Sequence, residues 1–375
     1  MAQGHAAPRW VFLGTDKGKG IYRARWDAAT GTIGAIELAV ETDRPDFFAI
    51  HPKLPVMYTV NSVGAGKGGV SGYRIDKASG ALTLINRASS HGDGPCAVSV
   101  GVNGREVFVA NYTGGSVASY NVESEGSLHT MNARDFSLSK PGLVPDRQDK
   151  SHMHCVVVSP NDDFMLSCDL GADLIRIFEI GMSQGDKGGY VLHSSAPYMR
   201  EAGVAAARAG SGPRHVAFHP TKKWLYCIHE LDSTVDLYDW SVAAGKVEMK
   251  LRENSVTSTL AKGTPLAGNT ACELFVSDDG RFLYTCTRGV DEIVVYRIDH
   301  STGLLTEHQR LSTGGKIPRY FTLDPSRKWL VCCNQGAGTT PVGNVTVFAH
   351  DAATGKLSEK PKVFAAETPM FTLFV

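Results

Sequence analysis

The sequence lacks a charge excess of either sign and lacks any apolar run long enough to cross a bilayer. Its 375 residues carry 38 Lys and Arg against 38 Asp and Glu. This balance argues against binding to nucleic acid or to a membrane surface through overall charge. No apolar stretch approaches the ~20 residues that a membrane-spanning helix needs. We therefore expect neither nucleic-acid nor membrane partners.

The sequence also lacks the features of an exported, disulfide-stabilised chain. Its first ten residues, MAQGHAAPRW, contain no apolar signal-peptide core. No CxxC pair occurs among the cysteines, which are Cys96, Cys155, Cys168, Cys227, Cys272, Cys286, Cys332 and Cys333. Most of them lie inside apolar runs such as FMLSCDL and WLYCIHE, where a thiol packs as a small hydrophobic group. We expect unpaired cysteines and a cytoplasmic protein.

Motifs of several common enzyme classes are absent as well. No Gly-x-Ser-x-Gly elbow is present, which disfavours a serine hydrolase. The glycine clusters at 64–69 and 210–212 lie between predicted strands and precede no helix, so they do not predict phosphate-binding loops. We expect no cofactor.

A strand-and-turn unit recurs along the chain. Its first strand reads RPDFFAIHP, GPCAVSVGV, HMHCVVVSP, GPRHVAFHP, TACELFVSD, IPRYFTLDP and TPMFTLFV. A second apolar strand follows most of these, as in VMYTVNS and WLYCIHE, and then a third, as in VSGYRI and IVVYRI. A period of about 45–60 residues built from short strands predicts a β-propeller. We expect an all-β, seven-bladed propeller of four-stranded antiparallel blades, forming one domain over residues 1–375.

The two ends of the chain predict how the ring closes. The last residues, MFTLFV, resemble an innermost strand with nothing after it, and WVFLGT at 10–15 resembles a second strand with nothing before it. Pairing them completes one blade and removes two open sheet edges. Three stretches, 135–154, 194–215 and 257–273, interrupt the rhythm before a first strand, and we interpret them as insertions.

Two columns of positions break the repeat with polar residues. In a propeller, the start of the first strand and the end of the second strand meet at one mouth of the central channel. The first position holds Asp46, Cys96, His154, Arg214, Cys272, Arg319 and Met370. The second holds Tyr112, Leu170, Glu230, Arg288 and Gln335. Residues kept for blade packing should be alike in every repeat, so this variety predicts a ligand site at the mouth.

The strongest candidates for chemistry are His154, Arg214, Glu230 and Arg288. As substrate-binding neighbours we add His152, His215, Arg319, Tyr112 and Gln335. His51 and His219 fall in turns on the opposite face and are interpreted as structural. His152, His154 and Glu230 are suitable zinc ligands, but positive charge from the arginines disfavours an ion there. We therefore predict no metal site.

The segments GPRHVAFHP, WLYCIHELDSTVDLY and ACELFVSDDGRFLYTCTRG resemble the seven-bladed β-propeller lactonase family. That family includes bacterial propeller-type 6-phosphogluconolactonases and fungal 3-carboxy-cis,cis-muconate cyclases. The resemblance spans nearly the whole chain and implies a site of one His, two Arg and one Glu, which match His154, Arg214, Arg288 and Glu230. His229 and Thr287 stand where relatives more often have Asn or Asp.

The leading hypothesis is metal-independent hydrolysis of an anionic sugar lactone by a monomer. The arginines would bind phosphate or carboxylate, one of them would stabilise the oxyanion, and Glu230 or His154 would be the general base. The first alternative is cyclisation of a muconate, with the arginines holding its carboxylates and His154 or Glu230 delivering a proton to carbon. The second is a non-catalytic propeller scaffold that binds partners.

Overall fold

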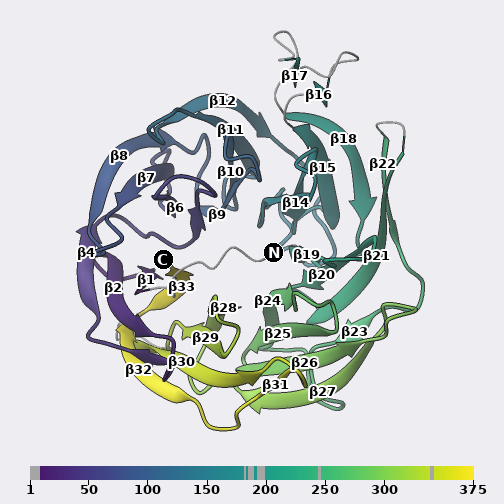
Figure 1. The fold of residues 1–375 in the computed structure, drawn as a ribbon. Helices are drawn as coiled ribbons and strands as arrows, with labels where there is room; N and C mark the ends of the chain where they lie inside the picture. Colours follow the sequence, from purple (N-terminus) through teal and green to yellow (C-terminus); the bar gives the residue numbers. More distant parts are fainter. Residues whose placement is uncertain (1–8, 181–182, 185–189, 192–198, 244–245, 338–341) are drawn as a thin grey trace.

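The chain forms a ring of seven β-sheets around a central axis, as Figure 1 shows for this computed structural model. The structure describes residues 9–375 except 181–182, 185–189, 192–198, 244–245 and 338–341. In each sheet every strand pairs antiparallel with its neighbours. Within these described ranges, no helix is long and apolar enough to cross a membrane. The predicted all-β, seven-bladed architecture is confirmed.

The blades are numbered here along the chain, with strands given from the axis outward. The first contains β33 (Pro369–Phe374), β1 (Trp10–Thr15), β2 (Gly20–Asp27) and β4 (Glu37–Glu41), with β3 (Thr32–Ile33) also on β2. The second contains β5 (Phe48–Ile50), β6 (Val56–Asn61), β7 (Gly69–Ile75) and β8 (Leu82–Ser89). The third contains β9 (Pro95–Val100), β10 (Glu106–Asn111), β11 (Ser116–Val122) and β12 (Leu128–Asp135).

The fourth blade contains β13 (Val157–Val158), β14 (Phe164–Asp169), β15 (Leu174–Ile180) and β18 (Met199–Ala206), and β16 (Ser183–Gln184) pairs separately with β17 (Tyr190–Val191). The fifth contains β19 (Pro213–Phe218), β20 (Trp224–His229), β21 (Thr234–Ala243) and β22 (Lys246–Leu251), with β23 (Thr257–Ser258) on β21. The sixth contains β24 (Thr270–Val276), β25 (Phe282–Arg288), β26 (Glu292–Ile298) and β27 (Leu305–Ser312). The seventh contains β28 (Pro318–Leu323), β29 (Trp329–Asn334), β30 (Val342–Asp351) and β32 (Lys362–Glu367), with β31 (Lys356–Leu357) on β30.

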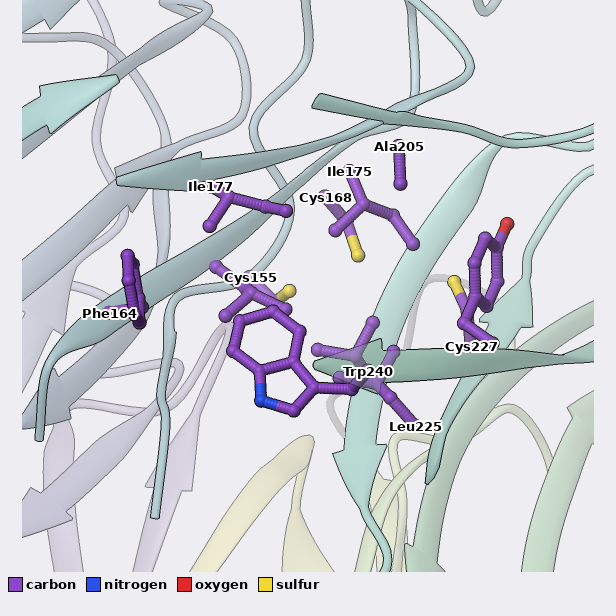
Figure 2. Close-up of a cluster of buried hydrophobic side chains, with 12 residues drawn as sticks. Cys155, Phe164, Cys168, Ile175, Ile177, Ala205, Leu225, Cys227 and Trp240 are labelled. Atoms are coloured by element: carbon purple, nitrogen blue, oxygen red, sulfur yellow. The ribbon is translucent and has the colours of Figure 1, made fainter. Parts of the chain in front are cut away.

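The core lies between neighbouring blades. Figure 2 shows one such cluster, in which Cys155, Cys168 and Ile177 of the fourth blade gather near Cys227 and Trp240 of the fifth. Blades present apolar side chains on both faces because each sheet is covered on both sides, which suits β-branched and aromatic residues. All the cysteines are free, as predicted; Cys96 is half-buried and the others are buried.

One predicted insertion is wrong in part. Residues 194–215 include β18, which pairs with β15 as the outermost strand of the fourth blade. The polar, alanine-containing sequence MREAGVAA lacks the apolar signal of an inner strand because an outer strand has alternating exposed positions. Residues 194–198 of that stretch lie outside the described part of the chain. Residues 136–152 form a loop that precedes the very short β13.

The ends of the chain close the first blade as predicted. β1 pairs antiparallel with β33 from Val11 opposite Phe374 to Thr15 opposite Pro369. All six residues of β1 are buried. Because β1 also pairs with β2, it joins the last strand of the chain to the remainder of its blade.

Deletion of residues 1–15 should therefore yield insoluble or aggregated protein. The deletion removes Trp10, Phe12 and Leu13 from the core, at roughly 1.5–3 kcal/mol for each large apolar side chain, and exposes the edge of β33. The soluble fraction and size-exclusion profile measure this, with a chain that begins at Arg9 and keeps β1 as the control. A soluble, monomeric deletion variant with the parent's melting temperature would rule out this closure.

Candidate functional site

A cavity of about 510 Å³ opens where the first strands begin and the second strands end. Its size is within the range of small-molecule sites. Of the two polar columns, the residues that line it are Asp46, Cys96, Tyr112, His154, Arg214, Glu230, Arg288, Arg319 and Met370. Cys272 and Leu170 are fully buried and do not line it. The structure thus brings together most of the residues at which the repeat breaks.

Glu230 lies at the centre of a cluster of cations. It follows β20, and its side chain is almost fully buried, at 3% exposed. Its Oε2 accepts a hydrogen bond from Arg214 Nε at 3.1 Å and lies 3.1 Å from Arg288 Nη2. Oε1 accepts a hydrogen bond from Arg147. Burial opposes ionisation of Glu230, but the charges of Arg288 and Arg214 and the hydrogen bond from His154 outweigh it and hold its pKa well below the usual range.

His154 lies beside Glu230 and, unlike the neighbouring arginines, is uncharged at neutral pH. Its Nε2 lies 3.5 Å from Glu230 Oε2, and its ring packs edge-on against Tyr112 and His215. Burial, followed by the positive charge of Arg214, lowers the pKa of His154 to about 3. The imidazole is therefore uncharged at neutral pH, and it can accept a proton only where that charge is stabilised by Glu230.

Arg147 was missed by the sequence interpretation. It lies on the loop before β13, within the predicted insertion 135–154, and it reaches across to Glu230 and to the hydroxyl of Tyr112 at 3.0 Å. Loops carry no periodicity, so column alignment could not find it. Tyr112 in turn stacks on His152, with ring centroids 4.5 Å apart.

Two of the predicted substrate-binding residues lie behind the cavity lining. The ring of His152 is within 2.9 Å of the carbonyl oxygen of Tyr112 and of Asp149 Oδ1. Gln335 donates a hydrogen bond to Asp16 Oδ2 at 2.9 Å. Neither lines the cavity, whereas His215 does, with Nδ1 2.9 Å from Glu273 Oε1.

His229, the residue beside Glu230, has a structural position. Its Nδ1 lies 3.1 Å from Ser211 Oγ and its Nε2 3.0 Å from Asp236 Oδ2. This Ser-His-Asp order matches that of a hydrolytic triad, but all three side chains are buried and none lines the cavity. Asn61 and Asn111, at the same place in other blades, are also buried and bond to the loop before their first strand. His229 is therefore bonded within its blade and lies outside the cavity lining.

The other side of the cavity carries a second carboxyl group. Asp46 precedes β5, and Arg44 Nη2 lies 3.8 Å from its Oδ2 while approaching Asp16 more closely, at 2.8 Å. Arg319, at the start of β28, completes this side. Burial and the neighbouring charge of Arg288 lower the pKa of Arg319. The lining thus contains five arginines and two carboxyl groups, Glu230 and Asp46.

Buried polar atoms without a protein partner gather at this mouth: Asp46 Oδ1, His154 Nδ1, Arg288 Nε and Arg319 Nε. Buried polar groups are nearly always hydrogen-bonded, so a group of unpartnered donors and acceptors indicates a ligand site. The part of the chain that the structure describes contains no cluster of three or more His, Cys, Asp or Glu residues arranged for a metal ion. The arrangement therefore fits an anion with hydrogen-bonding oxygens.

Comparison with known proteins gives matches over almost the full length. A family model described as "Lactonase, 7-bladed beta-propeller" matches residues 10–374. The chain is 31% identical over 358 residues to a 6-phosphogluconolactonase of Bacillus subtilis, with 95% of each chain covered. It is 28% identical to a 6-phosphogluconolactonase of Formosa agariphila, covering 94% of this chain and 95% of the relative. The solved periplasmic gluconolactonase of Pseudomonas aeruginosa matches with a TM-score of 0.85, 27% identity and 98% of each chain covered.

The lowered pKa of His154 predicts a pH dependence of stability. Between pH 6.5 and about 3, the unfolded chain binds a proton at this residue that the native protein does not. Stability should therefore fall as the pH drops through this window, by up to ~1.4 kcal/mol per pH unit from this residue. His154→Gln should flatten the slope.

Urea unfolding at several pH values between 4.5 and 7 measures this slope. His129→Gln is the matched control, because His129 is exposed on β12, and it should leave the slope at the parent's value. A slope in His154→Gln as steep as in the parent would contradict the assigned burial of a neutral imidazole.

Proposed function

Since the chain belongs to the seven-bladed β-propeller lactonase family, we propose that it hydrolyses the ester bond of an anionic sugar lactone at the channel mouth. The observation that carries this proposal is the excess of arginines around one buried, ionised carboxylate, Glu230, in a cavity of substrate size. The relatives named as 6-phosphogluconolactonases support a phosphorylated aldonolactone as the substrate class.

The arginines supply binding and charge stabilisation. Arg288 and Arg319 each keep a buried Nε–H without a protein partner, so each can donate to a phosphate or carboxylate oxygen. A lactone carbonyl gains negative charge when water adds to it. Arg288 or Arg214, both beside Glu230, would stabilise that oxyanion without having to reorganise.

Glu230 and His154 would accept the proton of the attacking water as a pair. Glu230 alone is a weak base because its pKa is held so low, and His154 alone is a weak base because charging it beside Arg214 is unfavourable. Protonation of His154 next to ionised Glu230 partly offsets that cost, so the proton belongs to the pair. Expulsion of the ring oxygen from the tetrahedral intermediate then yields the open hydroxy acid.

Glu230→Gln should lower turnover by about 10²–10⁴-fold, the usual scale of general base catalysis. The variant keeps the size of the side chain but removes its charge, so the arginines retain an anionic substrate and KM should not rise. Initial rates of lactone opening, corrected for spontaneous hydrolysis, measure both constants.

Glu253→Gln is the control, because Glu253 is exposed and is not one of the residues that line the cavity. The proposal is wrong if Glu230→Gln folds and equals the parent on every lactone and muconate that the parent accepts. Conversion of a muconate by the parent, with no lactone opened, would favour the cyclase.

Catalysis should not depend on a divalent metal. Arg214 and Arg288 place positive charge beside His154 and Glu230, and this charge repels a cation from two side chains that could otherwise ligate one. Exhaustive chelation should leave the rate of lactone opening unchanged. A loss of rate that zinc, calcium or magnesium restores would give His154 and Glu230 a ligand role instead.

A further inference from the structure

Asp46 is the one carboxyl group of the described cavity lining that the mechanism above does not use. It lies before β5 in the second blade, and its side chain is nine-tenths buried, at 10% exposed. One of its oxygens, Oδ1, is buried without a hydrogen-bond partner. Asp46 as a residue lines the cavity, and a carboxyl group there with a buried, unpartnered oxygen needs an explanation.

The surroundings of Asp46 disfavour its charge, in contrast to those of Glu230. Burial is the largest influence on the pKa of Asp46 and raises it, and the negative charge of Asp16 raises it further. Arg44, Ser62 and Arg319 lower this pKa, but they offset the rise only in part, so it reaches about 7. Arg44 is held mainly by Asp16, at 2.8 Å against 3.8 Å to Asp46. The remaining titratable neighbour, Cys96, stays a neutral thiol because burial raises its pKa to about 12.

The two carboxyl groups approach the cavity from opposite sides. Asp46 belongs to the second blade and Glu230 to the fifth, and in a ring of seven no two blades are farther apart than that (Figure 1). Both line the same cavity. Two titratable groups whose environments push their pKa values apart are the usual arrangement for a general acid and a general base.

We propose that Asp46 is the general acid of this reaction and protonates the ring oxygen of the lactone as it leaves. The proposal rests on the proposed lactone hydrolysis. Water forms the new C–O bond at the carbonyl carbon and gives one proton to the Glu230–His154 pair. The carbon–ring-oxygen bond then breaks, and the ring oxygen takes its electron pair and the proton of Asp46. Asp46 regains a proton from solvent, and the base pair releases one.

The test is the pH profile of kcat/KM and of kcat for a phosphorylated aldonolactone between pH 5.5 and 8.5, compared with Asp46→Asn. In the parent, kcat/KM should fall as the pH rises through about 7, because the acid of the free enzyme is then deprotonated, and kcat should fall through the pKa that the same acid has in the substrate complex. Asp46→Asn cannot supply a proton, so kcat should drop by about 10²-fold and lose this alkaline limb. Asp43→Asn is the control, since Asp43 is 73% exposed and its nearest ion-pair partner, Arg87, is 4.0 Å away; it should keep the parent's profile.

The outcomes separate this proposal from the proposed function. An active parent with a flat profile up to pH 8.5 overturns the role of Asp46 whatever the variant does. So does a folded Asp46→Asn variant that keeps the parent's kcat and alkaline limb, or that only raises KM, because then Asp46 merely positions Arg44 or Arg319. A parent that opens no lactone refutes the proposed function itself.

Discussion

The buried carboxylate of Glu230 is the charge that allows three arginines and a histidine to meet at the channel mouth. Without this carboxylate, Arg147, Arg214 and Arg288 would be partly or wholly buried cations that lack the negative charge with which all three now pair. Buried ion pairs contribute little net stability, because removing both charges from water costs about as much as their attraction returns. Stabilisation of the blades therefore does not explain the cluster, whereas the proposed anionic substrate does.

The ring of blades brings residues from different blades together at the channel mouth. Every blade contributes at least one residue to the cavity lining, and the hydrophobic core lies between blades. Some polar residues close to the cavity in the sequence are fully buried and bond within their blade. His229, the residue before Glu230, is one of them, and its partner is Asp236. Glu230, which lines the cavity, thus directly follows the structural His229 at the end of β20.

The sequence predicts the blades, their closure and most of the mouth, because repetition places equivalent positions in register. His154, Arg214, Glu230 and Arg288 all line the cavity, and the resemblance to lactonases is confirmed by the family model. Arg147 could not be predicted, since it reaches the site from a loop with no period. Periodicity also says nothing about which polar side chains point outward and which are covered, so the positions of His152 and Gln335 behind the lining required the structure.

The most direct measurement is the initial rate of base consumption on adding a phosphorylated aldonolactone, set beside its uncharged parent lactone at equal concentration. The central claim is that buried arginines hold an anionic lactone for attack by water. It predicts opening well above the spontaneous rate, with a lower KM for the phosphorylated compound. Equal KM values for both compounds would contradict the anion site, and no opening of either above the spontaneous rate would contradict the account as a whole.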